Sequence, residues 1–187
     1  MSARALVVLA NGFEDIEAIT VVDVLRRGEV EVVTASLAGG LDVRSAHGVV
    51  MRADATFADA ADAPYDAIVL PGGGEGTANL RDSDALRARL LRQKEDGGLI
   101  CAICAAPLVL VDIEGLLEPE QHVTCYPTCA LDLDRPCAGV PVVSDGNIIT
   151  GQAPGSSMLF ALVILRTLEG DKVAGKVARG LVTSALD

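Results

Sequence analysis

The sequence predicts an α/β protein with a doubly wound, mostly parallel sheet sandwiched between two layers of helices. Apolar runs of strand length alternate along the chain with segments of helical periodicity. Most strand runs are apolar throughout, which is typical of strands that are buried on both faces. The 187 residues are enough to enclose one sizeable core, so we expect a single domain over residues 1–187.

The first part of the chain predicts two strands, a helix between them, and a further short strand or hairpin. Residues 5–10 are continuously apolar and predict the first strand, and a helix that ends before Gly28 follows. Residues 30–35 are rich in β-branched side chains and predict the second strand. Residues 49–53 predict a further short strand or hairpin.

Two more strand–helix pairs are predicted in the middle of the chain. The segment 66–76, DAIVLPGGGEG, indicates a buried strand that stops at Pro71 and three glycines. The next helix has Ser83 as its N-cap and ends at a glycine pair. Residues 99–104 then predict a strand, and residues 105–117 a short apolar helix.

The last third of the chain predicts three short strands and two helices. The strands cover residues 123–126, 140–143 and 148–150. A strongly apolar helix follows, capped by Ser156 or Ser157, and the final helix covers about residues 171–179.

Composition and charge argue against several classes of function. A net charge of −11 disfavours nucleic-acid binding, which needs a basic surface, and no apolar run reaches the roughly 18 residues of a membrane helix. The N-terminal apolar run is interpreted as the first strand and not as a signal peptide. Because the five cysteines are odd in number and unevenly spaced, we expect a reduced, cytoplasmic protein with at least one thiol available for chemistry.

Cys104 is the strongest candidate for a nucleophile. It falls where a predicted strand gives way to a helix, and ligands of such sheets bind beyond the carboxyl ends of the strands. Pro107 suits the first turn of that helix, whose free N–H groups favour a thiolate. The alternative is an inert core cysteine, because free cysteine is among the most buried residue types.

The other cysteines indicate neither a redox pair nor a metal site. Cys101 lies within the strand, so its side chain is held away from Cys104 and we expect it to fill the core. A zinc site would need a second matching pair, which Cys125, Cys129 and Cys137 do not provide. We expect these three to be mostly structural, and we expect no bound metal.

The glycines after Pro71 allow two interpretations. They resemble a phosphate-binding loop, but the lysine and serine or threonine of that motif are missing. Their bare N–H groups suit an anion or a developing oxyanion, and a simple tight turn explains them equally well.

Five segments occur in order over nearly the whole chain: GFEDIEA, VLPGGGEGTANL, AICAAP, VTCYP and TGQAPGSSMLFALVILRTLEG. Together they resemble the ThiJ/PfpI superfamily, and within it the DJ-1 branch of glyoxalases and deglycases. The resemblance implies a flavodoxin-like homodimer with Cys104 on a strained nucleophile elbow. It also implies that Glu17 is a protonated carboxyl that hydrogen-bonds the thiolate, with its pKa raised by burial. Alternatively, Glu17 is an ordinary acidic residue at a helix start.

The resemblance assigns further roles by position. Gly72 and Gly73 would donate N–H groups to an oxyanion, together with the N–H of Ala105, and Arg27 would lie at a dimer interface. A solvated charge at a helix end explains Arg27 equally well.

Two departures from the family pattern limit the chemistry. Human-type members carry histidine where this chain has Tyr126, which would hydrogen-bond, line the pocket or simply pack. Protease and hydratase branches have histidine directly after the nucleophile, and Ala105 at this position excludes their Cys-His-Glu triad. Of the two histidines, His47 lies in a predicted loop near the position of a dimer-interface arginine of the family, so it could approach a partner's pocket or lie apart from it. His122 is expected at the surface.

The resemblance implies a cofactor-independent glyoxalase or deglycase. Its substrates would be small aldehydes, methylglyoxal or glyoxal, or their early glycation adducts, with Cys104 forming a hemithioacetal and Glu17 acting as acid and base. The alternative is an oxidative-stress sensor or chaperone in which Cys104 is oxidised to a sulfinate. A third possibility is a non-enzymatic domain with an inert cysteine.

Overall fold

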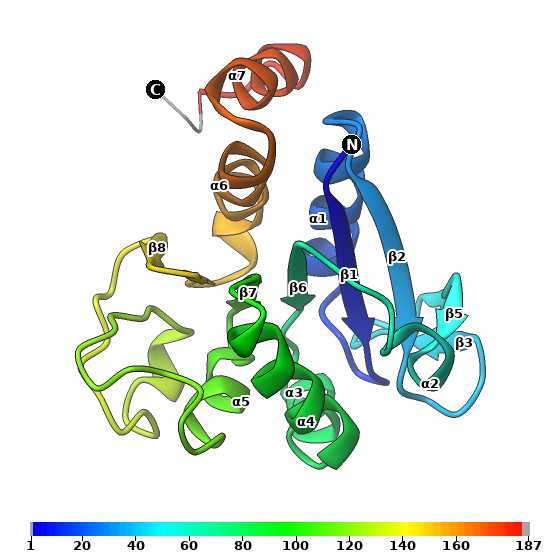
Figure 1. Cartoon of the computed structure of the whole chain (residues 1–187), viewed down its shortest axis with the longest axis vertical. Coiled ribbons are helices and arrows are strands. Elements are labelled where there is room, and N and C mark those ends of the chain that lie inside the picture. The colour runs from blue at the N-terminus through cyan, green and yellow to red at the C-terminus, as the bar shows by residue number, and fades with distance from the viewer. Residues whose placement is uncertain (1, 185–187) are drawn as a thin grey trace.

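Seven strands form the central sheet of the computed structural model, which describes residues 2–184 (Figure 1). They are β1 (Arg4–Leu9), β2 (Glu31–Ser36), β5 (Ala55–Thr56), β6 (Ala67–Leu70), β7 (Leu99–Ile103), β8 (Val142–Asp145) and β9 (Ile148–Gly151). Their order is β5-β2-β1-β6-β7-β9-β8. All neighbours pair in parallel except β8, which runs antiparallel to β9 at one edge. The predicted doubly wound, mostly parallel sheet is confirmed.

Helices cover both faces of this sheet. One face carries α1 (Asp15–Arg27), α6 (Ser157–Glu169) and α7 (Asp171–Gly180); the other carries α2 (Phe57–Ala60), α3 (Gly74–Arg81), α4 (Asp84–Glu95) and α5 (Pro107–Val111). Successive residues of β1 alternate between the two buried clusters, because side chains of a strand point to opposite faces. No helix within residues 2–184 combines the length and apolar content that a membrane span requires.

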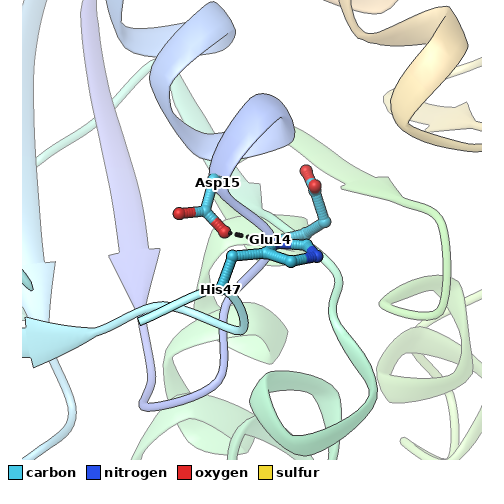
Figure 2. A group of neighbouring side chains, drawn as sticks. All are labelled: Glu14, Asp15 and His47. Carbon is cyan, nitrogen blue, oxygen red and sulfur yellow. Dashed lines mark hydrogen bonds and ion pairs between the residues drawn. The ribbon is translucent and has the colours of Figure 1, made fainter. Parts of the chain in front are cut away.

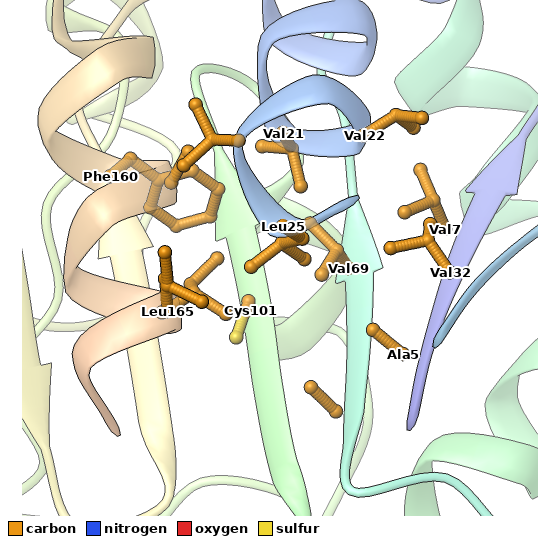
Figure 3. Close-up of a cluster of buried hydrophobic side chains, with 14 of the residues drawn as sticks. Ala5, Val7, Val21, Val22, Leu25, Val32, Val69, Cys101, Phe160 and Leu165 are labelled. Atoms are coloured by element: carbon orange, nitrogen blue, oxygen red, sulfur yellow. The ribbon is translucent and has the colours of Figure 1, made fainter. Parts of the chain in front are cut away.

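The core under α1 and α6 holds the cysteine that precedes the candidate nucleophile. Leu25 of α1 and Phe160 of α6 pack above Val69 of β6 and Cys101 of β7 (Figure 3). Cys101 is fully buried, so its predicted role in filling the core is confirmed.

Two predicted elements of secondary structure need correction. Residues 123–126 form no strand; within them only Val123 makes an isolated bridge, with Cys137. Helix α5 ends at Val111, well short of residue 117, and the chain soon turns at Gly115 with a φ of 76°. Helix α3 was not predicted, because it begins in the glycine run and buries few apolar residues. A second strand, β3 (Asp42–Arg44), completes a hairpin with β4 (Val50–Arg52).

The predicted serine caps differ in outcome. Ser83 caps α4 as expected, with its hydroxyl accepting the N–H of Leu86 at 3.2 Å. Ser156 occupies the N-cap position of α6, but its hydroxyl accepts the N–H groups of Gln152 and Ala153. Its hydroxyl therefore stabilises the turn before the helix and does not cap the N–H groups of α6.

Candidate active site

Cys104 lies on a strained backbone turn at the carboxyl edge of the sheet, directly after β7. Its φ is 66°, a left-handed conformation that costs a non-glycine residue about 1–3 kcal/mol. Three backbone hydrogen bonds hold the turn. The N–H of Cys104 donates to the carbonyl of Gly151 (3.0 Å), that of Tyr126 to the carbonyl of Cys104 (2.7 Å), and that of Ala106 to the carbonyl of Ile103 (3.0 Å). The strain is therefore imposed by β9 and by the segment around Tyr126.

Glu17 is buried beside this turn, in the first turn of α1. Its side chain is 0 % exposed, and the N–H of Gly72 donates to Oε2 at 2.7 Å. Burial raises the pKa of Glu17 to about 7; the N–H of Gly72 and the Cys104 side chain lower it, and the charge of Glu14 raises it. A substantial fraction of Glu17 is therefore protonated at neutral pH, unlike an ordinary solvated acid at a helix start.

Gly72 lies between these two side chains. A Cβ added there would be 2.7 Å from the Cβ of Cys104 and 2.8 Å from Oε2 of Glu17. Its N–H is engaged by Glu17. This N–H orients the carboxyl group in the structure, and the oxyanion role implied for Gly72 stays a prediction.

Two other N–H groups face the sulfur of Cys104, those of Gly73 and Ala105. Burial, the charge of Glu17 and a hydrogen bond with Glu17 raise the pKa of Cys104 to about 12, while these two N–H groups lower it. Burial thus opposes the thiolate that was expected at Cys104. Helix α5 is too short for its N-terminal dipole to stabilise a negative charge on the sulfur strongly. Protonation of Glu17 removes the repulsive charge and turns the carboxyl into a donor for the sulfur.

Glu14 supports Glu17 and was not singled out from the sequence. It is the N-cap of α1, 8 % exposed, and its carboxylate accepts the N–H of Glu17 at 2.8 Å. Its own N–H donates to the carbonyl of Gly72 at 3.0 Å. This hydrogen bond joins the loop that follows β1 to the loop that follows β6. Only glycine fits at position 73, because its φ is 93° and a Cβ there would lie 2.2 Å from the carbonyl oxygen of Gly12. In the sequence, this contact is indicated by an acidic N-cap residue, Glu14, three positions before a second acidic residue, Glu17.

Tyr126 contributes its backbone to the site. Its N–H holds the carbonyl of Cys104, whereas the residue is 41 % exposed. The side-chain role that was expected from its place in the family pattern stays a prediction.

A polar cluster lies at the start of α1, beside the hairpin that follows β2. Asp15 accepts a hydrogen bond from Ser45 and pairs with Nδ1 of His47 at 2.8 Å, as Figure 2 shows for the histidine. Glu14, Asp15 and His47 offer three ligand atoms within 4.8 Å of one another, the one such group among residues 2–184. The hydrogen bond with Asp15 and its charge raise the pKa of His47. These internal bonds account for the cluster without a cation.

The remaining charged candidates lie at the surface. Arg27 pairs with Asp23 at 2.7 Å and is half exposed, so its place at a dimer interface stays a prediction. His122 pairs with Asp145 at 3.1 Å and is largely exposed, which confirms the expected surface position.

Comparison with known proteins shows the family and the fold of the chain. Residues 3–167 match the model of the DJ-1/PfpI family. The chain is 39% identical to Protein dj-1beta of Drosophila melanogaster over 187 residues, covering 98% of this chain and 99% of that protein. It is 33% identical to the Glutathione-independent glyoxalase DJR-1.2 of Caenorhabditis elegans, covering 90% and 89%.

A solved structure shares both the fold and the sequence pattern. The structure of oxidized Toxoplasma gondii DJ-1 superposes with a TM-score of 0.91 at 35% identity, covering 98% of this chain and 100% of that one. The fold is therefore the flavodoxin-like fold of DJ-1 proteins. From the match over residues 3–167 and these relatives, we conclude that the chain belongs to the DJ-1/PfpI family.

Proposed function

We propose that this protein is a cofactor-independent glyoxalase that converts small 2-oxoaldehydes, methylglyoxal or glyoxal, into 2-hydroxy acids. The carrying observation is the fully buried Glu17, which lies beside Cys104 and has a pKa raised to about 7. A relative that is named a glutathione-independent glyoxalase supports the reaction class. Early glycation adducts are further substrates in this proposal, because they contain the carbon of the same aldehyde group.

The first step joins sulfur to the aldehyde. The Cys104 thiolate attacks the aldehyde carbon, a C–S bond forms, and the carbonyl electron pair moves onto oxygen. The N–H groups of Gly73 and Ala105, which face the sulfur, would stabilise that oxyanion. Protonated Glu17 then supplies a proton to the oxyanion, which gives a hemithioacetal.

The second step moves a proton along the substrate. Oε1 of Glu17 is buried and has no hydrogen-bond partner among the described residues, so in this proposal it is the carboxyl oxygen that acts on the substrate. The Glu17 carboxylate removes the proton from the former aldehyde carbon to give an enediolate, and the carboxyl group so formed returns this proton to the neighbouring carbon. The hydroxyl proton on the former aldehyde oxygen moves to the neighbouring oxygen, which leaves a thioester. Water cleaves the resulting thioester, which releases the 2-hydroxy acid and the thiol. The net change is addition of one water molecule, with no oxidant or reductant.

The test is lactate formation from methylglyoxal without glutathione. We expect turnover by the wild-type protein and by Cys129→Ser, whose thiol lies outside the site, and none above background by Cys104→Ala. Wild-type lactate production no higher than that of Cys104→Ala would rule the proposal out.

A second candidate function is peroxide sensing through a Cys104 sulfinate. The N–H groups of Gly73 and Ala105 together with Glu17 offer donors to sulfinate oxygens. The Toxoplasma gondii relative carries the word oxidized in its name. Selective addition of two oxygen atoms at Cys104 by mild peroxide, together with negligible aldehyde turnover, would favour the sensor over the enzyme.

We also propose a cytoplasmic homodimer. Four large apolar residues are about half exposed at the start of α1 and on the adjacent hairpin: Ile16, Ile19, Val49 and Val50. Bonds from Asp15 to Ser45 and His47 hold these two elements together, and we propose that the four residues form one apolar patch on which a second copy of the chain binds. All five cysteines are free, which suits a reducing compartment.

A further inference from the structure

Two cysteines outside the candidate active site lie in direct contact. The Sγ atoms of Cys125 and Cys137 are 3.8 Å apart, and we call these residues the thiol pair. They lie in a small buried cluster with Leu108, Val123 and Leu133. Neither residue has a part in the chemistry proposed for Cys104.

The backbone fixes the thiol pair in register. Val123 and Cys137 form a parallel bridge, and the N–H of Ala138 donates to the carbonyl of Val123 at 2.9 Å. Between the two cysteines the only regular element is the short 3₁₀ turn Pro127–Cys129. This irregular segment can absorb the small movement that brings two sulfurs in contact to the roughly 2.05 Å of a disulfide bond.

The two thiols differ in a way that suits consecutive steps. Burial raises the pKa of Cys125 to about 12, and Cys125 is fully buried. Cys137 is only partly buried. Burial raises its pKa, but hydrogen bonds with the backbone of Gly139, with the backbone and thiol of Cys125 and with the side chain of Thr124 together outweigh this effect and lower the pKa below its ordinary value. Cys137 is therefore the more accessible and more ionised thiol, and Cys125 is the neighbour within reach of it.

We propose that Cys125 and Cys137 are a modification site, at which a peroxide forms a reversible intramolecular disulfide. The Cys137 thiolate attacks one peroxide oxygen, the O–O bond breaks, and a sulfenic acid forms as the first water or alcohol leaves. Cys125 then attacks that sulfur; the S–S bond forms, and the sulfenic oxygen leaves as water with the thiol proton. The two thiols lose two electrons, which the peroxide gains, and a dithiol reductant reverses the change.

The thiol pair lies next to the backbone segment that holds the turn at Cys104. The thiol of Cys125 donates to the carbonyl of Tyr126 at 3.3 Å, and the N–H of Tyr126 holds the carbonyl of Cys104. The disulfide would tie this supporting segment to residue 137.

The experiment uses the full chain with Cys104→Ala, so that the candidate nucleophile neither reacts nor exchanges. After mild hydrogen peroxide and alkylation of remaining thiols, unreduced peptides are mapped by mass spectrometry. We expect a crosslinked peptide joining Cys125 to Cys137, a loss of two hydrogen atoms, and reversal by dithiothreitol. Adding Cys129→Ser should leave the crosslink intact, whereas adding Cys137→Ser should abolish it.

Three outcomes would overturn the proposal. They are full alkylation of Cys137 after peroxide, a crosslink that joins Cys129 instead, and addition of oxygen atoms to Cys137 with no loss of hydrogen. Because Cys125 is fully buried, the test relies on the partly exposed Cys137 and on the crosslink in a protein that keeps both thiols.

Discussion

Glu17 and Cys104 face each other across Gly72, where an added Cβ would lie 2.7 Å from the Cβ of Cys104 and 2.8 Å from Oε2 of Glu17. Only a residue without a side chain fits between them. The pair is buried, so a charge on one member strongly affects the proton of the other. The proposed chemistry depends on this shared proton.

Glu17→Gln should separate thiol reactivity from turnover. The amide oxygen can still accept the Gly72 N–H, and the amide N–H₂ can donate to sulfur, but it cannot carry a proton to the substrate. We expect lactate formation to fall by about 100-fold or more, the usual contribution of a general acid–base group. Alkylation of Cys104 by iodoacetamide should persist. Full turnover in this variant would contradict a proton-transfer role for Glu17.

Glu17 should also make stability depend on pH. Its pKa is raised in the folded protein from 4.5 to about 7, so the folded state holds this proton more tightly than the unfolded state. Protonation of Glu17 stabilises the folded state by about 3 kcal/mol, at 1.36 kcal/mol per pKa unit. This contribution is complete below about pH 4.5 and is lost as the pH rises to about 7. In denaturant unfolding, the free energy of unfolding of Glu17→Gln should therefore rise relative to that of the wild type over this pH range. A constant difference between the two proteins would exclude the shift.

Gly72→Ala should disrupt the site. The methyl group would overlap Cys104 and Glu17, so we expect loss of turnover and about 1–3 kcal/mol of destabilisation from overpacking. Gly74→Ala is the matched control, because a Cβ at Gly74 meets no atom within 4 Å. Activity and unfolding free energy are the measurements, and equal behaviour of the two variants would refute the packing argument.

Ile19→Glu should dissociate the proposed homodimer by placing a charge in the apolar patch on α1. Light scattering after size-exclusion chromatography should give twice the 19.3 kDa chain mass for the wild type and the single-chain mass for the variant. Leu131→Glu, at a site 93% exposed and outside the patch, should remain dimeric. A monomeric wild-type protein would end this part of the account.

The local sequence was informative about the sheet and about Cys104. Apolar runs predicted β1, β2, β6 and β7 because parallel strands are buried on both faces. The change from strand to helix before Pro107 predicted where the nucleophile turn lies, and its φ of 66° now shows the strain.

Long-range contacts account for what the sequence did not predict. The partner of the Gly72 N–H is Glu17, 55 residues away in the chain, so no local pattern indicates it. Burial of Cys104 likewise depends on packing between elements distant in sequence, and it reverses the effect expected from a helix N-terminus. The segment 123–126 has strand-like composition, but it pairs only through Val123.

The pH dependence of Cys104 alkylation by iodoacetamide, followed by mass spectrometry of its peptide, is the most direct test. The pair loses its first proton near pH 7, the raised pKa of Glu17, and its second near pH 12, the pKa of Cys104 beside ionised Glu17. If the pair shares its proton as proposed, the alkylation rate should rise with a midpoint near pH 7. A rate that rises only above the pKa of about 8.5 of an ordinary cysteine would show that the proton stays on sulfur, and would contradict the proposal.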